Sequence, residues 1–227
     1  MERISFTVGR INMEYVVLDN FTPKSLQDRI EHLLMFSEQV TWQYRSQTGG
    51  VSDTQDPDNT SIRETFQHSH DMYAYDTGGA KSPLIETVMS NMYFIEQAYG
   101  PIEMLHRVKA NLLIKDVEAV NTYHPPHVDS LMDNSLSMVY YVNDSDGDTI
   151  LFDKQVDHTS PNRHQHLGLT EIGRVSPKKG RAVIFNSNRF HASSMPIDNE
   201  RRVVINTVFL ASSELNKRIS VVNYEDK

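Results

Sequence analysis

Two side chains that can bind a metal lie two residues apart within residues 123–130, which read YHPPHVDS. His127 and Asp129 project to the same side of the chain if this segment is extended, because side chains alternate along a strand. The two prolines favour an extended backbone, since a residue that precedes proline is disfavoured in the helical region. A His-x-Asp triplet also arises by chance in a chain with 10 histidines, so a metal site needs support from other residues.

A third candidate ligand lies downstream, in the stretch KKGRAVIFNSNRFHASSMP. A glycine turn leads into the apolar segment AVIF, and a short polar link then places His191 near the end of a strand. Two neutral imidazoles and one carboxylate on one face of a metal suit non-haem Fe(II), and they leave positions open for a chelating cosubstrate and for O₂. His127, Asp129 and His191 are therefore the predicted metal ligands.

An arginine pair heads the next apolar run, VVINTVFL. A guanidinium can hold the far carboxylate of a cosubstrate through two parallel hydrogen bonds. Arg201 and Arg202 cannot both point inward, because adjacent strand residues face opposite sides. Arg202 shares its face with Val204, Asn206 and Val208, whereas the Arg201 face is suited to packing outward against helices. We favour Arg202 as the inward residue and Arg201 as a solvated charge, and the choice between them stays open.

The order of these segments resembles the Fe(II)/2-oxoglutarate-dependent oxygenases, particularly their prolyl-hydroxylase-like branch. The resemblance covers roughly residues 107–210 and rests on His-x-Asp, GDT, PKKGRAVIFNSNRFHASSMP and the arginine that heads a strand. It implies a jelly-roll core in which His127, Asp129 and His191 hold Fe(II), with 2-oxoglutarate and O₂ as cosubstrates. The resemblance also implies that a tyrosine after His-x-Asp touches the distal carboxylate of 2-oxoglutarate, and Tyr141 in MVYYVND is the better-placed candidate.

The sequence departs from the family pattern in three places. Asp148 in DGDTILF stands where glutamate is usual, and the spacing from His191 to Pro196 is one residue longer than expected. The stretch before His-x-Asp is the compact TYHPPHVD rather than a longer, glycine-containing segment. This last departure bears on the loop that faces the substrate, not on the metal site.

The activity implied by the resemblance is hydroxylation of a substrate C–H bond with release of succinate and CO₂. The substrate is a small molecule or a protein or peptide, and the branch favours a peptide only by analogy. The main alternative is a non-catalytic jelly-roll module that binds a ligand. A zinc hydrolase with two histidines, one aspartate and a water ranks low, because no glutamate that could act as general base lies beside His-x-Asp.

The pattern of elements predicts an α+β chain, mainly β, with a double-stranded β-helix (jelly-roll) core braced by N-terminal helices. A single domain spans residues 1–227, with helix-rich support over about 1–105 and the catalytic core over about 106–225. Short β-rich runs after residue 106 would build the core: RVKANLLIK, VEAVNTY, SLSMVYYV, DTILFD, RAVIFN, RVVINTVFL and ISVVN.

The first half of the chain predicts two strands and two helices. Residues 3–18 indicate a pair of strands around a turn. One helix begins at Thr22-Pro23, with Thr22 as its N-cap. A second helix runs from Ser82-Pro83 to Gly100-Pro101.

The remaining histidines are expected to play structural or solvated roles. His124 would be a loop residue or a contact that supports the ligands. His68 and His70, and likewise His164 and His166, are expected in solvated loops. Residues 154–180, which include His158, are expected to form a mobile loop near the barrel mouth.

Composition excludes several classes of protein. No cysteine is present, which rules out disulfides, thiolate metal sites and thiol nucleophiles. A net charge of −8 argues against a nucleic-acid partner. The charged start MERISFTVGR is unlike a signal peptide, and no apolar run approaches the length of a membrane span, so a cytoplasmic location is expected.

Overall fold

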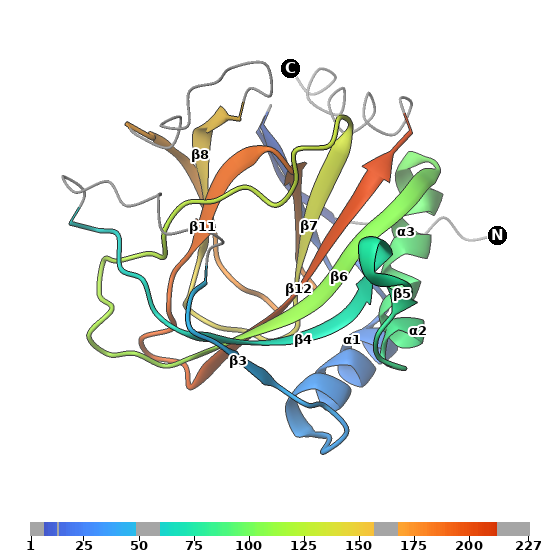
Figure 1. Cartoon of the computed structure of the whole chain (residues 1–227), viewed down its shortest axis with the longest axis horizontal. Coiled ribbons are helices and arrows are strands. Elements are labelled where there is room, and N and C mark those ends of the chain that lie inside the picture. The colour runs from blue at the N-terminus through green and yellow to red at the C-terminus, as the bar shows by residue number, and fades with distance from the viewer. Residues whose placement is uncertain (1–6, 13, 49–59, 157–167, 213–227) are drawn as a thin grey trace.

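Two β-sheets face each other in the fold (Figure 1). The computed structural model describes residues 7–12, 14–48, 60–156 and 168–212. The major sheet has the strand order β1-β2-β10-β7-β12-β6-β4-β3, with β5 paired to β4, and the minor sheet has the order β11-β8-β9. The strands are β1 (Thr7–Asn12), β2 (Tyr15–Asp19), β3 (Gln43–Arg45), β4 (Gln67–Ala74), β5 (Gly79–Ala80), β6 (Ile102–Ile114), β7 (Ser135–Tyr141), β8 (Thr149–Gln155), β9 (Glu171–Val175), β10 (Ala182–Asn186), β11 (Arg189–Ser193) and β12 (Arg201–Ala211).

The helices pack on the outer face of the major sheet (Figure 1). They are α1 (Lys24–Glu31), which continues as the π-helical turn η1 (His32–Phe36), the 3-10 turn η3 (Tyr75–Thr77), α2 (Ile85–Val88) and α3 (Ser90–Tyr99). Ile30, Val88 and Ile95 from these helices join one apolar cluster with the outward side chains of the sheet. None of the described helices is long and apolar enough to cross a membrane.

Strand alternation sorts side chains between this helix-covered core and the interior of the barrel. On β7, Met138 and Tyr140 pack in the cluster under the helices, whereas Val139 and Tyr141 pack in the cluster between the sheets. On β12, Val203 faces the helices and Val204 faces the interior. The inner faces therefore supply the pocket, and the outer faces supply most of the apolar burial that stabilises the fold.

The predicted jelly-roll core and its helical support are confirmed, and several details differ. Thr22 is not the N-cap of α1, because Pro23 occupies that position and the Thr22 hydroxyl lies 3.3 Å from the Tyr140 hydroxyl. The second predicted helix is divided at Met89 into α2 and α3, and Gly100 ends it with a φ of 118°.

Three predicted loops and strands are corrected. The run VEAVNTY, expected as a strand, forms turns between β6 and β7. His68 and His70, expected in a solvated loop, lie on β4, where hydrogen bonds to β6 fix them in the sheet. Residues 154–180 are not one loop, because β9 lies within them and pairs with β8. His158, His164, His166 and the run ISVVN lie outside the described residues.

The N-terminal half contributes strands as well as helices. β2 pairs with β10, and β4 pairs with β6, so both strands belong to the same sheet as the predicted core. The helix-rich description of residues 1–105 was therefore incomplete. The sheet pairing extends the jelly-roll instead of adding a separate layer.

Candidate metal centre and cosubstrate pocket

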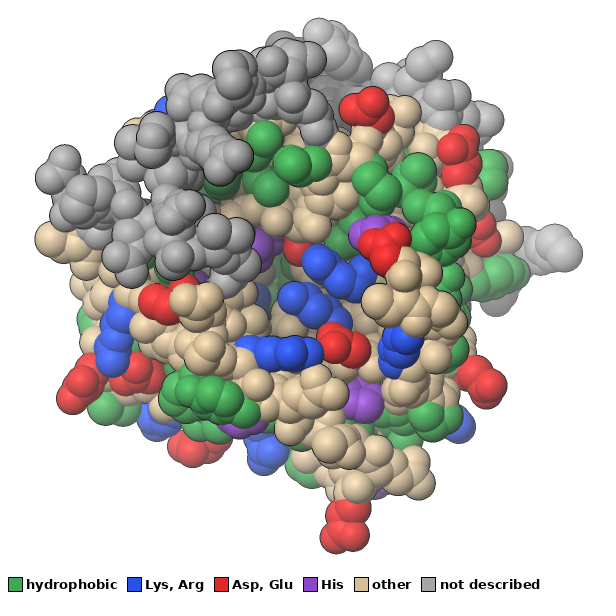
Figure 2. Space-filling model, viewed as in Figure 1, with side chains coloured by type: hydrophobic (Ala, Val, Ile, Leu, Met, Phe, Trp, Pro, Cys, Tyr) green, Lys and Arg blue, Asp and Glu red, His purple; other side chains and the backbone are tan. Residues whose placement is uncertain are grey.

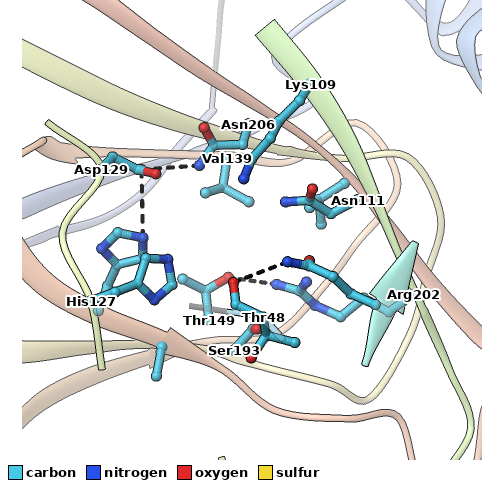
Figure 3. A pocket seen from close by; sticks show the side chains of 14 residues that line it. Thr48, Lys109, Asn111, His127, Asp129, Val139, Thr149, Ser193, Arg202 and Asn206 are labelled. Carbon is cyan, nitrogen blue, oxygen red and sulfur yellow. Dashed lines mark hydrogen bonds and ion pairs between the residues drawn. The ribbon is translucent and has the colours of Figure 1, made fainter. Parts of the chain in front are cut away.

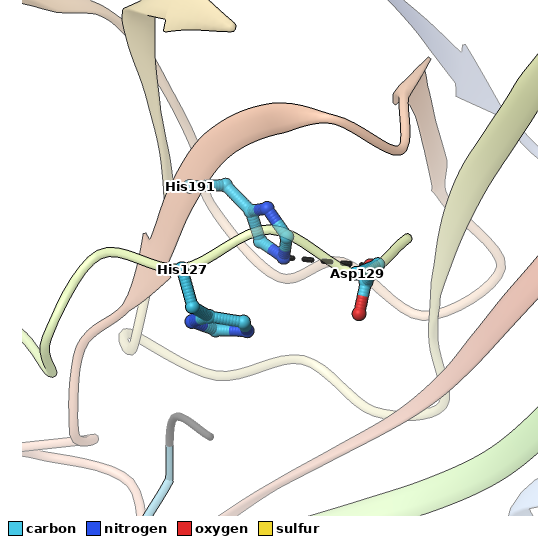
Figure 4. Close-up of side chains that lie close together, drawn as sticks. All are labelled: His127, Asp129 and His191. Atoms are coloured by element: carbon cyan, nitrogen blue, oxygen red, sulfur yellow. Dashed lines mark ion pairs between the residues drawn. The ribbon is translucent and has the colours of Figure 1, made fainter. Parts of the chain in front are cut away.

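The structure brings His127, Asp129 and His191 together at one end of the interior (Figure 4). One ligand atom from each lies within 4.8 Å of the others. His127 and His191 form an antiparallel bridge, with both backbone N–H···O distances at 2.9 Å, so their side chains lie side by side on one face. Asp129 reaches the same face from two residues along the chain, as the extended segment predicts.

Backbone carbonyls set the orientation of both imidazoles. The Nδ1 atom of His127 lies 3.3 Å from the Pro125 carbonyl oxygen, and the Nδ1 atom of His191 lies 3.1 Å from the Arg189 carbonyl oxygen. A carbonyl can only accept, so each Nδ1 carries the proton and each Nε2 keeps a free lone pair. Burial, followed by the neighbouring His191, lowers the pKa of His127 to about 3, which keeps its ring neutral and able to bind a metal.

Asp129 is held as a carboxylate by surrounding donors. Arg107 donates to Oδ1 at 2.7 Å, while Ser137 and Asn206 donate to Oδ2 at 2.7 and 3.0 Å. Burial would raise the pKa of Asp129, but the electrostatic effects of His191 and Arg107 outweigh it and hold that pKa well below its usual value. The carboxylate therefore stays ionised and fixed in direction.

Arg202 lies across the pocket from the metal ligands (Figure 3). It is 3% exposed, and its guanidinium donates to the Gly147 carbonyl at 2.6 Å and to the Thr149 hydroxyl at 2.8 Å. No carboxylate within the described part of the chain forms an ion pair with it. Arg201 is exposed and lies over the Phe36 ring, so the inward choice of Arg202 made from strand alternation is confirmed.

The Tyr141 hydroxyl points away from the pocket space. It donates to the Thr149 hydroxyl at 2.7 Å and lies 3.1 Å from the Val175 carbonyl oxygen. The Arg202 guanidinium sits 5.7 Å from the centre of the Tyr141 ring, and burial raises the pKa of this tyrosine to about 12. Tyr141 thus lies beneath Arg202 and Thr149, and these two residues line the pocket while Tyr141 does not.

His124 supports the bridge from outside the metal cluster. Its ring nitrogens lie 2.8 Å from the Thr65 hydroxyl and 2.9 Å from the Ser193 hydroxyl. The residue is 1% exposed, and burial, with the charge of Arg202, lowers its pKa to about 3. This supporting role was one of the two expected from the sequence.

Sequence reasoning missed several polar residues on the inner faces of the central strands. The pocket holds about 450 Å³ of space, counted with its open mouth. Apart from the ligands and Arg202, its polar lining is Thr48, Gln67, Lys109, Asn111, Thr149, Ser193 and Asn206. The alternation R-V-K-A-N in β6 is the signal that could have found Lys109 and Asn111, because Val108 and Ala110 between them pack against the helices.

Comparisons with known proteins agree with this geometry. The family model described as the 2OG-Fe(II) oxygenase superfamily matches residues 116–210, which include all three clustered ligands and Arg202. No curated protein matches the chain.

Solved structures of low sequence identity share the fold. An oxidoreductase of the 2OG-Fe(II) oxygenase family from Burkholderia pseudomallei is 14% identical, with a TM-score of 0.59 over 94% of this chain and 97% of that chain. The epimerase SnoN from nogalamycin biosynthesis, in complex with Fe³⁺, α-ketoglutarate and nogalamycin RO, is 13% identical, with a TM-score of 0.54 over 88% of this chain and 80% of that chain.

The predicted resemblance is thereby confirmed at the level of the superfamily. Its members are oxidoreductases that use Fe(II), 2-oxoglutarate and O₂. The jelly-roll fold predicted from the sequence is the fold of the solved relatives. Residues 116–210 of this chain are thus similar in sequence to the 2OG-Fe(II) oxygenase superfamily, and the described fold is that of its solved members.

Proposed function

We propose that this protein is an Fe(II)- and 2-oxoglutarate-dependent dioxygenase that hydroxylates a C–H bond of a second substrate and releases succinate and CO₂. In this proposal His127, Asp129 and His191 hold the iron. Arg202 and Thr149 bind the distal carboxylate of 2-oxoglutarate. Tyr141 acts as a positioning residue through its hydrogen bond to Thr149 and its packing under Arg202.

The observation that carries the proposal is a buried guanidinium, that of Arg202, which has no anionic partner among the described residues and faces a cluster of metal ligands across one pocket. Burial lowers the pKa of Arg202, so its charge is held at a cost in solvation. Its described partners, Gly147 and Thr149, are neutral. An anion at this end of the pocket would offset the cost, and a 2-oxo dicarboxylate presents one carboxylate to Arg202 and chelating atoms to a metal.

The donor set fits Fe(II). Two free imidazole Nε2 atoms and one carboxylate oxygen on a single face form the two-histidine, one-carboxylate arrangement, which leaves positions for a bidentate cosubstrate and O₂. Bound iron supplies the activation of O₂ that drives oxidative decarboxylation. The protein's own residues orient both carboxylates of 2-oxoglutarate, keep His127 neutral, and enclose the reacting atoms between the two sheets.

A non-catalytic binding module with the same fold is the rival function. It would use the polar pocket for a ligand but would not need both imidazole Nε2 atoms directed at a common point. A hydrolase is less well supported, because no glutamate is among the described residues that line the pocket.

The test is the absorption spectrum of the metal-free protein under anaerobic conditions, with Fe(II) added first and 2-oxoglutarate second. We expect a weak visible charge-transfer band that requires both additions. The His191→Ala variant should lack the band, whereas His70→Ala, which removes a histidine on β4 outside the cluster, should keep it. A folded, iron-loaded protein that shows no band would favour the binding module.

A further inference from the structure

Lys109 is a cation on the pocket wall that the proposed function does not use. It lies on β6, where Arg107, Lys109 and Asn111 occupy alternate positions, while Val108 and Ala110 between them face the helices. Figure 3 shows Lys109 and Asn111 on a different side of the pocket from Arg202 and Thr149. The pocket therefore has two cationic regions, one at Arg202 and one at Lys109, and the proposed function assigns a ligand only to the first.

Lys109 also borders a second depression, which we call the outer groove. Its lining residues are Arg45, Gln47, Thr48, Gln67, Ser69, Asp71, Arg107 and Lys109. Thr48, Gln67 and Lys109 line both spaces, so they mark the passage between the pocket and the groove. Lys and Arg side chains gather around a hollow on this face of the molecule (Figure 2). A chain with a net charge of −8 thus presents positive charge where a substrate would enter.

The charges around the passage leave one cation unbalanced. Arg45 pairs with Asp71 at 3.0 Å, and Arg107 pairs with Asp129 at 2.7 Å. The side-chain ammonium of Lys109 forms no ion pair or hydrogen bond with any residue in the described segments. Desolvation, followed by the charge of Arg107, lowers the pKa of Lys109 against the opposing influence of Asp129 and Asp71, so these two carboxylates compensate its charge only in part.

One polar group near Lys109 is also unsatisfied within the described part of the chain. The side-chain oxygen of Asn111 is buried and has no hydrogen-bond partner among the described residues. The Gln67 amide instead donates to the backbone carbonyls of Gln47 and Thr48, which fixes the edge of the passage. A half-buried, desolvated ammonium near an unsatisfied amide oxygen is costly unless a ligand meets both groups.

2-Oxoglutarate does not account for Lys109 if the proposed function holds. One carboxylate of the cosubstrate is assigned to the metal, and the other is assigned to Arg202. Both of its negative charges are then matched, and Lys109 lies on the side that opens to the outer groove. The ligand that reaches this residue must come through the groove, as the second substrate would.

We propose that Lys109 binds a carboxylate of the primary substrate and thereby places a neighbouring C–H group toward the metal cluster. This inference rests on the proposed function and names its substrate class: a carboxylic acid, either a small acid or an acidic residue of a peptide. A single unbalanced positive charge matches one carboxylate better than a doubly charged phosphate ester. No arginine fork is free at the passage for a phosphate, because Arg45 and Arg107 are already paired.

The experiment uses protein loaded with Zn(II) and 2-oxoglutarate, which prevents turnover, and a panel of N-acetyl amino acids with their matched amides. Binding is measured by ligand-observed NMR titration. We expect at least one acid to bind the wild type about tenfold or more tightly than its amide, because a hydrogen bond to a charged group is worth at least this ratio. Lys109→Met should abolish the preference, and Lys109→Arg should retain most of it. Lys115→Met removes a lysine that pairs with Glu200 outside the pocket and should behave as the wild type.

Two results would overturn the proposal within this panel. One is a wild type with no preference for acids over amides, and the other is a preference that survives in Lys109→Met. A matched phosphate ester that binds more tightly than every acid would also contradict the assignment to a carboxylate.

A separate titration with 2-oxoglutarate distinguishes this inference from the proposed function. Lys109→Met should bind 2-oxoglutarate with the affinity of the wild type, and a large loss would reassign Lys109 to the cosubstrate and overturn the inference. Failure of the wild type itself to bind 2-oxoglutarate would overturn the proposed function instead. Repeating the acid and amide comparison with Zn(II) alone then tests Lys109 independently.

Discussion

The two ends of the pocket are prepared in opposite ways. At the metal end, each side-chain atom that would not bind a metal already has a partner: a carbonyl for each imidazole Nδ1 and three donors for Asp129. At the other end, Arg202 is equally buried, but it meets only neutral acceptors and the Tyr141 ring. Each end contains an arginine. Arg107 is neutralised by Asp129, whereas no carboxylate in the described ranges pairs with Arg202.

This difference separates positioning from binding. Groups that must keep one geometry are fixed by the protein, because an unanchored ligand loses affinity for its metal. A group that must accept an anion is left uncompensated, because an internal carboxylate would compete with the ligand. Lys109 belongs to the second kind, although it lies near the metal end.

The largest effect is expected from Asp129→Ala, which breaks the metal end. Turnover should fall by at least about 100-fold, since loss of a ligand exceeds the roughly 10–100-fold effect of losing a supporting contact. The measurement is succinate formation, with circular dichroism to verify folding. Asp28→Ala removes a half-exposed carboxylate on α1 that is paired to Lys179 outside the pocket, and it serves as the control. Full consumption of 2-oxoglutarate by Asp129→Ala would show that another residue supplies the carboxylate ligand.

Arg202→Met tests the other end. The dissociation constant for 2-oxoglutarate should rise by about 10–100-fold, the range for losing a charged hydrogen-bonding partner. Fe(II) affinity measured without 2-oxoglutarate should change little, because Arg202 contacts none of the metal ligands. Arg201→Met is the matched control, since Arg201 is exposed and lies over Phe36. Equal increases of the dissociation constant in Arg202→Met and Arg201→Met would contradict the assignment of Arg202 to the distal carboxylate.

Ser137→Ala removes one of the three side chains that donate hydrogen bonds to Asp129 at the metal end. The Ser137 hydroxyl donates to Asp129 at 2.7 Å, so its loss should weaken Fe(II) binding by about tenfold. The affinity for 2-oxoglutarate at saturating metal should remain near that of the wild type. Ser135→Ala on the same strand removes a hydroxyl bonded to the Met132 carbonyl and provides the control. Unchanged metal affinity in Ser137→Ala would mean that the other two donors suffice.

The smallest effect concerns stability rather than activity. The pKa of His124 is lowered to about 3, so the unfolded chain takes up its proton near pH 6.5 while the folded chain does not. The stability that the folded protein gains from a neutral His124 is therefore fully present above about pH 6.5, and it is lost as the pH falls toward 3. When the pH falls from about 6.5 to 5.5, the free energy of unfolding of the wild type should decrease by about 1 kcal/mol more than that of His124→Gln. Urea unfolding of metal-free protein at both pH values measures it, and parallel pH dependence of the two proteins would contradict the assignment.

Much of the candidate site follows from local sequence. Side chains two apart share a face, which places His127 with Asp129 and orients Arg202 inward and Arg201 outward. Applied to β6, the same rule places Lys109 and Asn111 together on the face that lines the pocket. Local patterns failed where tertiary contacts decide. β4 reads as a polar, histidine-containing loop, yet pairing with β6 makes it a strand.

The sequence by itself determined the ligand types, the inward faces of the strands and the resemblance to a known family. Only the tertiary structure decided which of these faces meet. Asn206 and Arg107 converge on Asp129 from 77 and 22 residues away, through β12 and β6, which are neighbours in the sheet. It also decided that Arg107 is neutralised whereas Arg202 and Lys109 are not. Charge compensation depends on distances between strands that are far apart in sequence, and alternation within one strand carries no information about them.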